Sequence, residues 1–205
     1  MPHEASPLKR IQWFPFRNDN AGTIPAFGVM RITGVEERHG NALYTVDKPS
    51  TTFQRLYLIN GPLDVPAGGY GSGTFDVAYA LCSSSASPGY GESWGAKHDE
   101  WKLFENRPGF FVLGGYTGTG DDQRALVRQQ EVLKLFGTLD GSLSQGSSAT
   151  MSVYFRDSSS WTDSTMNVTV NDRLLKSGAT AISSGKWVAA DWYGDIWVAT
   201  AAECN

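Results

Sequence analysis

Apolar and polar positions alternate in short runs along most of the chain, a pattern typical of β-strands. Residues 27–34, FGVMRITG, alternate between two faces, and one face is richer in apolar side chains. Similar runs cover residues 41–49 and 53–62, and turn residues such as Asn60–Gly61–Pro62 separate them. Strands with turns at such spacing are typical of a sandwich or barrel. We therefore expect a mainly all-β chain, with an N-terminal β-sandwich or barrel followed by a small C-terminal β-barrel.

The same pattern divides the chain into four segments, and no fixed-period repeat is evident. Prolines favour an extended arm over residues 1–16, and strand patterns predict an N-terminal β domain over residues 17–122. Residues 123–147 are predicted to be a connector, whose apolar positions fit a helical stripe or two short strands equally well. Residues 148–205 are expected to form the C-terminal barrel.

The last strand-like runs form a predicted hairpin with Gly194–Asp195 at its turn. This turn puts Trp192 opposite Trp197, on a face shared with three small apolar residues. The other face has Asp191 as its one charge, so we expect the N-terminal domain or another chain to cover it, with Lys186 or a neighbouring cation pairing Asp191. The inner face also holds Val188, Ala190 and Ala199, and the outer face holds Trp187, Ala189, Tyr193, Ile196 and Val198.

Composition removes several classes of function. The formal charge is −4 and no Lys/Arg cluster occurs, so we expect no nucleic-acid partner. No apolar run approaches the roughly 20 residues of a membrane span. The first residues lack the apolar core of a signal peptide, which predicts synthesis in a cytoplasm and reduced thiols at Cys82 and Cys204.

The candidate chemical motifs lack the context that their chemistry needs. The glycine run at residues 68–73 precedes a strand rather than a helix, which argues against phosphate binding. Residues 17–23, RNDNAGT, hold too few carboxylates for a calcium loop. His3, His39 and His98 are isolated from one another and from both cysteines. We predict no catalytic, cofactor-binding or metal residues and no enzymatic activity, with a hydrolase built from distant carboxylates as the alternative.

Aromatic residues supply the candidate interface positions. Trp13, Phe14 and Phe16 flank Pro15, where they form either a plug for a partner's groove or the first core residues. Together with the exposed side of the hairpin, they make up the predicted interface: Trp13, Phe14, Phe16, Trp187, Tyr193, Ile196 and Val198.

Two stretches carry a resemblance to a known class of proteins. They are NDNAGTIPAFGVMRITG with the later YLINGP, VPAGGYG and GESWGAKHDEWKLFENRPGFFVLGG, and LDGSLSQGSSATMSVYF with NVTVNDRLLKSG and ISSGKWVAADWYGDIWVATAAEC. Both resemble uncharacterised structural proteins of tailed bacteriophages and prophages, over most of the chain from about residue 17.

The resemblance implies a non-enzymatic component of the virion, made in the cytoplasm of the bacterial host. A capsid decoration or cement protein is the first choice, held to the major capsid protein and to further copies of itself, and a tail, neck or fibre protein is the nearest variant. A glycan-binding host-recognition module is the alternative from another class, with Trp94, Trp187 and Tyr193 as stacking platforms. No cofactor, nucleic acid or membrane is expected in any of these.

Overall fold

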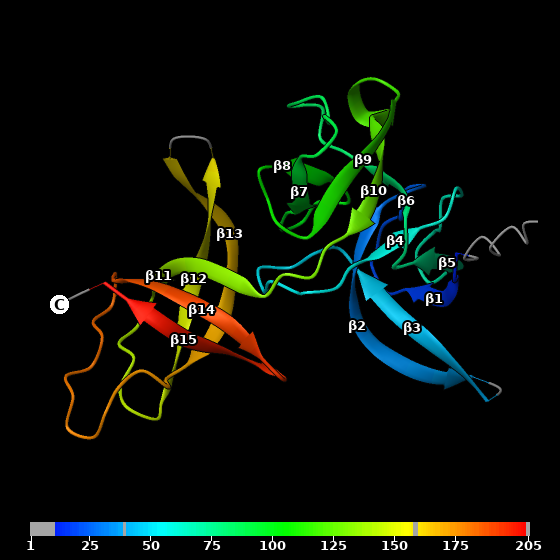
Figure 1. Ribbon diagram of the computed structural model, residues 1–205. Helices are drawn as coiled ribbons and strands as arrows, with labels where there is room; N and C mark the ends of the chain where they lie inside the picture. The colour runs from blue at the N-terminus through cyan, green and yellow to red at the C-terminus, as the bar shows by residue number, and fades with distance from the viewer. Residues whose placement is uncertain (1–10, 39, 158–159, 204–205) are drawn as a thin grey trace, which may run out of the picture.

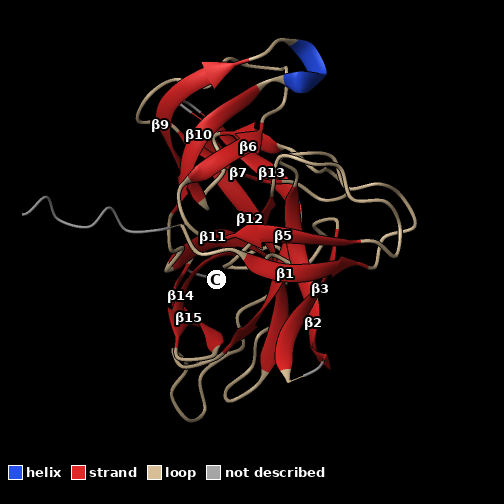
Figure 2. Cartoon of the chain, turned by 90° about the vertical axis from the view of Figure 1, so that its right-hand side faces the viewer, coloured by secondary structure: helices blue, strands red, loops and turns tan. Residues whose placement is uncertain are grey.

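The computed structural model describes residues 11–38, 40–157 and 160–203, and within them the chain is nearly all β. Figure 1 shows three β-sheet bodies. The described chain begins on one side of the molecule, and its last five strands lie on the opposite side. The one helical element in these described ranges, the 3₁₀ turn Gly120–Asp122, lies at a tip beyond β9 and β10 (Figure 2). No helix in the described residues is long and apolar enough to cross a membrane. The predicted all-β class is confirmed.

The first body, here called barrel A, is a closed five-stranded barrel. Its strands are β1 (Phe14–Asn18), β2 (Val29–Arg38), β3 (Asn41–Asp47), β4 (Leu58–Asn60) and β5 (Tyr70–Thr74), in the order β1-β3-β2-β4-β5. The pairing of β1 with β3 is parallel, and the other pairings are antiparallel. A separate apolar cluster fills its interior: Phe16, Ile24, Met30, Val46, Leu58 and Val65.

The second body, sheet B, is a five-stranded sheet whose strands have the same neighbours as those of barrel A, once a bridge between its two edges is counted. Its strands are β6 (Ala78–Leu81), β7 (Ser93–Ala96), β8 (Leu103–Glu105), β9 (Phe110–Thr117) and β10 (Arg124–Gln129), in the order β6-β10-β9-β7-β8. A parallel bridge joins Cys82 to Leu103, and the Ser83 N–H donates to the Leu103 carbonyl at 2.8 Å. Because this bridge links the ends of β6 and β8, each strand of sheet B has the same neighbours as its counterpart in barrel A.

The third body, barrel C, is again closed and five-stranded. Its strands are β11 (Lys134–Leu139), β12 (Ser148–Asp157), β13 (Ser160–Asn171), β14 (Trp187–Tyr193) and β15 (Ile196–Ala202), in the order β11-β12-β13-β15-β14. The pairing of β13 with β15 is parallel. This is the order of an OB-type barrel. Barrel A has the same order when its strands are counted from β4, so that β4, β5, β1, β2 and β3 correspond to β11, β12, β13, β14 and β15. The three bodies therefore share one pattern of strand neighbours.

Four turns of one geometry lie before strands of barrels A and C. In each four-residue turn, the carbonyl of the first residue accepts a hydrogen bond from the N–H of the fourth residue. The third residue has positive φ, as in a type II turn. The residue before each turn is buried and pairs with its counterpart in the same barrel, Ile24 with Val65 and Leu143 with Ile182. The turns are Pro25–Gly28, Pro66–Gly69, Ser144–Ser147 and Ser183–Lys186, and the positive-φ residues are Phe27, Gly68, Gly146 and Gly185.

Phe27 is the non-glycine member of that set, and it joins barrel A to sheet B. Its φ of 62° costs about 1–2 kcal/mol relative to a right-handed conformation. Its ring meets Tyr79 edge-on at 6.3 Å, and the Arg124 guanidinium lies 4.8 Å from the ring centroid. The Leu81 N–H donates to the Phe27 carbonyl at 2.9 Å. These contacts with sheet B offset the backbone cost.

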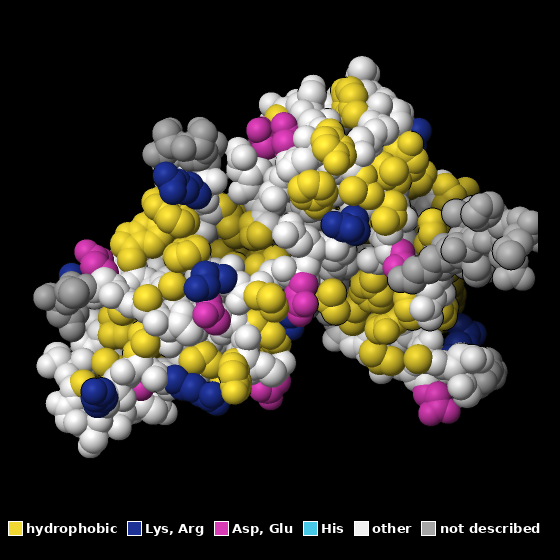
Figure 3. All heavy atoms as spheres, viewed as in Figure 1, with side chains coloured by type: hydrophobic (Ala, Val, Ile, Leu, Met, Phe, Trp, Pro, Cys, Tyr) yellow, Lys and Arg dark blue, Asp and Glu magenta, His cyan; other side chains and the backbone are white. Residues whose placement is uncertain are grey.

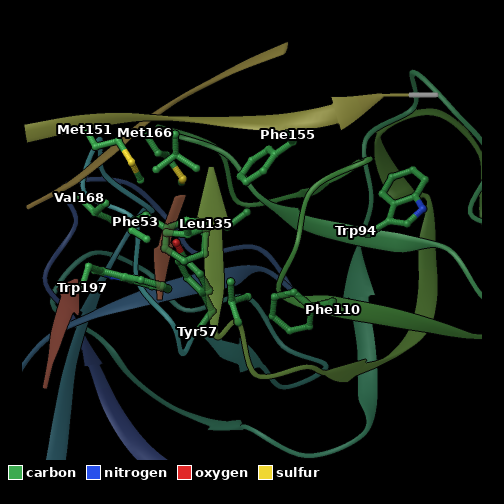
Figure 4. Close-up of a cluster of buried hydrophobic side chains, with 14 of the residues drawn as sticks. Phe53, Tyr57, Trp94, Phe110, Leu135, Met151, Phe155, Met166, Val168 and Trp197 are labelled. Carbon is green, nitrogen blue, oxygen red and sulfur yellow. The ribbon is translucent and has the colours of Figure 1, made fainter. Parts of the chain in front are cut away.

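The connection between β3 and β4, residues 48–57, joins all three bodies and is called here the hub segment. Phe53 reaches barrel C, where its ring meets Trp197 at 6.4 Å and its N–H donates to the Asn167 carbonyl at 2.9 Å. Tyr57 packs against Phe110 of sheet B at 6.4 Å. Figure 4 shows Phe53, Tyr57 and Leu135 within one continuous group of buried side chains that extends from Trp197 to Trp94.

The observed elements differ from the predicted segments in two places. Residues 123–147, expected to be a connector, contain β10 of sheet B and β11 of barrel C, so the open choice resolves to two strands. Alternating side chains of β11 face the core and the exterior, and its backbone completes barrel C, which therefore begins before residue 148. The predicted arm, residues 1–16, overlaps β1 from Phe14, and residues 1–10 of it lie outside the described residues.

Substituting Phe53→Ala should destabilise the whole molecule. Loss of a buried phenyl ring costs about 3–5 kcal/mol, and Phe53 is 6% exposed. Urea unfolding followed by tryptophan fluorescence measures the change. Leu56→Ala, in the same segment but 54% exposed, is the matched control and should change stability by less than about 0.5 kcal/mol. Equal effects of the two substitutions would show that Phe53 does not hold the bodies together.

The turn geometry predicts a second pair of substitutions. Gly146 has a φ of 67° with nothing near its missing Cβ, so Gly146→Ala should cost about 1–2 kcal/mol through the backbone alone. Gly141 also has open space around it but no positive φ, and Gly141→Ala should be neutral or slightly stabilising. Thermal melts of both variants test this, and a neutral Gly146→Ala would contradict the turn assignment.

Candidate binding surface

The inner face of the β14–β15 hairpin follows the prediction. Trp192 lies opposite Trp197 in the register, and the rings meet edge-on at 5.2 Å. Trp197 is buried, whereas Trp192 is half-buried with the Arg55 guanidinium 4.4 Å from its ring centroid. The other predicted inner residues, Val188, Ala190 and Ala199, are buried. The tryptophan pair therefore forms part of the shared core, with Trp192 at its edge towards the hub segment.

The outer face of the hairpin does not form one covered surface. Val198 is buried, Trp187 and Ile196 are half-buried, and Tyr193 is 66% exposed with the Arg173 guanidinium 4.9 Å from its ring centroid. Burial of the outer face, which was expected to be covered by the N-terminal domain or another chain, therefore differs from residue to residue. Trp187 packs against Tyr154 and Trp161 of its own barrel, at 4.9 and 5.2 Å between ring centroids.

Asp191 on the same face has a partner within barrel C. Its carboxylate lies 3.2 Å from the Lys134 ammonium, and the two residues are directly opposite each other in the pairing of β14 with β11. The expected partner was Lys186 or a cation of a neighbouring chain. Lys134 lies opposite Asp191 because β11 pairs with β14. Lys134 was expected to lie in a connector, so this pairing was not predicted from the sequence.

Four aromatic residues from four adjacent strands meet on the outside of barrel C. Phe136, Tyr154, Trp161 and Trp187 come from β11, β12, β13 and β14, and here they are called the aromatic face. Trp187 lies 4.9 Å from Tyr154 and 5.2 Å from Trp161, and Trp161 lies 5.5 Å from Phe136, all between ring centroids. Phe136 and Trp161 remain 41% and 43% exposed.

Strand alternation explains why these rings point outwards. Leu135 and Val153 are buried in the barrel, so their neighbours Phe136 and Tyr154 occupy the outer side, where the register places them directly opposite each other. On barrel C, hydrophobic side chains gather over the strands below the β12–β13 hairpin tip, and Lys or Arg side chains lie beside them (Figure 3).

A groove of about 470 Å³ opens beside this face, between barrel C and the β8–β9 turn of sheet B. Its charged lining residues are Arg107, Lys134 and Arg156. Arg107 donates to the Ser164 carbonyl at 2.7 Å and lies 5.5 Å from the Phe155 ring centroid. Burial lowers the pKa of the Arg107 guanidinium, and the nearby Asp163 carboxylate opposes that effect. The remaining lining residues are Ser93, Asn106, Pro108, Leu135, Phe136, Tyr154, Phe155 and Trp161, and the whole is called here the aromatic groove.

A larger cavity, about 680 Å³, lies where the hub segment meets barrels A and C. It is lined by Phe53, Leu56 and Trp192, and an Arg55–Glu131 ion pair lies at its edge. Its lining belongs to the joint between the bodies, so we assign it a structural role.

Of the aromatic residues predicted as binding positions, Phe16 and Trp94 belong to the core and Phe14 packs against it. Phe16 is fully buried in barrel A, and Phe14 packs against Tyr44 and Phe75 at 5.9 and 5.2 Å. Trp94 is fully buried in sheet B and donates to the Glu92 carboxylate at 3.0 Å, so it offers no face for a sugar. Trp13, in contrast, is 46% exposed.

Sequence reasoning did not identify Phe136, Tyr154 and Trp161 as surface residues. Each is the polar-side position of an alternating strand, and an aromatic residue at such a position is the signal that was missed. Their convergence also depends on the register of four strands that span more than fifty residues, which the pattern alone does not give.

Neither a metal-holding cluster nor an accessible thiol is found among the described residues. No group of three or more His, Cys, Asp or Glu side chains among them is placed to hold a metal ion. Cys82 is a buried free cysteine, and burial raises the pKa of its thiol to about 12. Of the isolated histidines, His3 and His39 lie outside the described residues, as does Cys204.

Comparisons with family models, with curated proteins and with solved structures find no match to this chain. The geometry of its own surfaces therefore carries the functional argument.

The raised pKa of Cys82 predicts an unreactive thiol. At about pH 8, only about one molecule in ten thousand would carry the thiolate, and burial also blocks access. A Cys204→Ser variant should therefore resist an aromatic disulfide reagent when native and react rapidly in guanidinium chloride. Adding Cys82→Ser and Tyr90→Cys gives an exposed control thiol, since Tyr90 is 80% exposed. Rapid labelling of native Cys82 would contradict its placement in the core.

Proposed function

We propose that the protein is a non-enzymatic structural component of a tailed-bacteriophage virion, and that it decorates the capsid. The resemblance of two long stretches to phage structural proteins supports the virion context. The observation that carries the proposal is an exposed apolar surface on barrel A, along the turn that follows β4 and close to the start of the described chain. The protein would be made in the host cytoplasm and act on the particle.

This surface, called here the N-terminal surface, comprises Trp13, Leu63 and Tyr70, which are 46%, 76% and 56% exposed. Trp13 lies over the turn that follows β4, since a Cβ placed on Gly61 would be 3.6 Å from its ring. Leu63 and Tyr70 line a shallow hollow of about 340 Å³ on that turn. Clustered exposed apolar side chains of this kind are typical of interaction sites.

A capsid suits such a surface because it repeats one binding site many times. Where neighbouring copies on the particle touch one another, each weak attachment is strengthened by its neighbours, so a modest affinity per copy gives lasting attachment. The major capsid protein is therefore the proposed partner, and self-association between adjacent copies is proposed beside it. The barrel C end, on the far side of the molecule in Figure 1, would then point away from the attachment site.

Sedimentation with purified particles tests the proposal. The tagged protein is mixed with heads that lack it, and separately with isolated tails of the same phage, and the pellets are quantified. We expect binding to heads, and a loss of at least about tenfold in affinity for the double variant Trp13→Ser, Leu63→Ser, because buried apolar anchors dominate such interfaces. Both side chains are exposed, so the melting temperature should stay unchanged.

Tyr90→Ser provides the matched control, since Tyr90 is 80% exposed on sheet B and lies outside the N-terminal surface. It should bind heads as the wild type does. Binding to tails alone would overturn the capsid assignment in favour of a tail, neck or fibre position. Binding to neither particle would overturn the virion assignment.

A further inference from the structure

We propose that the aromatic groove of barrel C binds an anionic carbohydrate chain. This inference rests on the geometry of barrel C and does not depend on the virion assignment. It replaces the expected stacking platforms Trp94 and Tyr193 with Trp161, Phe136 and Tyr154, and it retains Trp187 as their support.

The rings supply an apolar bed of the right kind. Neighbouring rings tilt by 50–59° to one another, and their centroids lie 4.9–5.5 Å apart across β11 to β14. Sugar rings present a flat array of C–H bonds that packs on aromatic faces, and the outer side of the second and third strands is where OB-type barrels bind oligosaccharides or oligonucleotides. Tyr154 and Trp161 lie on those two strands, β12 and β13.

The charges select the class of sugar. Arg107, Lys134 and Arg156 line the groove, in a protein whose formal net charge is −4. Asp191 pairs with Lys134, and Asp163 lies near Arg107, so the local surplus of positive charge is modest. Arginine side chains bind carboxylate or sulfate groups through paired hydrogen bonds. The groove therefore fits a chain that carries acidic groups at intervals, such as a polymer of uronic acids.

The same features disfavour single-stranded nucleic acid. Bases are bound by stacking in succession on aromatic faces along a positively charged channel. Here the four rings already contact one another at steep angles, so they leave no slots between parallel faces. Binding of an oligonucleotide is therefore an alternative outcome of the test.

Titration of the full chain with defined oligomers tests the proposal. The probes are an octamer of galacturonic acid, an octamer of guluronic acid, a neutral glucan octamer and a thymidine oligonucleotide of similar length, followed by calorimetry. We expect at least one acidic octamer to bind with an affinity that falls as salt is added. The neutral octamer and the oligonucleotide should bind at least about tenfold more weakly.

Two independent variants locate the site. Trp161→Ala and Arg156→Gln change exposed side chains, and each should weaken binding of the acidic octamer at least about tenfold while a thermal melt shows that the chain remains folded at the temperature of the titration. Tyr90→Ala and Arg128→Gln, which alter an exposed aromatic and an exposed arginine of sheet B, should leave binding unchanged.

Failure of both acidic octamers to bind, tighter binding of the oligonucleotide, or binding that survives both groove variants would each overturn the proposal. No particle is needed for this titration, so its failure leaves the sedimentation result unaffected, and the reverse also holds.

Discussion

The packing of the hub segment into two neighbouring bodies is the interaction on which the rest of the structure depends. Phe53 and Tyr57 leave barrel A, and their rings enter the apolar interior shared by barrel C and sheet B. The backbone at Phe53 and Asn167 is hydrogen-bonded, which fixes the direction from which barrel C approaches. Because buried side chains pack as densely as crystals, such a joint holds the bodies at one relative position. The aromatic groove, which lies between barrel C and sheet B, depends on that position.

Barrels A and C share a local feature beside their common strand order. In barrels A and C, a buried aliphatic residue precedes a type II turn and pairs with its counterpart across the barrel, as Ile24 does with Val65. The turn requires a residue that tolerates positive φ, and glycine meets that need with the least strain. Phe27 departs from glycine where the turn must also contact sheet B, so one position combines turn formation with joining of the bodies.

The sequence predicted the parts of the fold that depend on neighbouring residues. Alternation identified most strands, and Gly194–Asp195 fixed the register that places Trp192 opposite Trp197. The pattern could not distinguish strand from helix around Leu126 and Leu135, because short apolar runs fit both. The pattern also could not predict that Phe16 and Trp94 are buried. A local run of residues does not distinguish a core aromatic from an interface aromatic until the long-range strand pairing is known.

The candidate surfaces show the same limit. Trp13 was named as an interface candidate because it lies in a conspicuous aromatic run, and its side chain is 46% exposed. The aromatic face was missed because it draws one ring from each of four strands, and Arg107 reaches the same groove from another body. Sites assembled by register and by the docking of bodies carry no local signal in a single sequence.

Differential scanning calorimetry of the wild-type chain tests most directly whether the hub segment makes the three bodies one cooperative unit. The account predicts a single transition in which the calorimetric and van't Hoff enthalpies agree, with a total of about 140 kcal/mol if the midpoint lies near 60 °C. Two or more separate transitions, or a van't Hoff enthalpy well below the calorimetric one after reversible unfolding, would show that the bodies unfold independently and would contradict it.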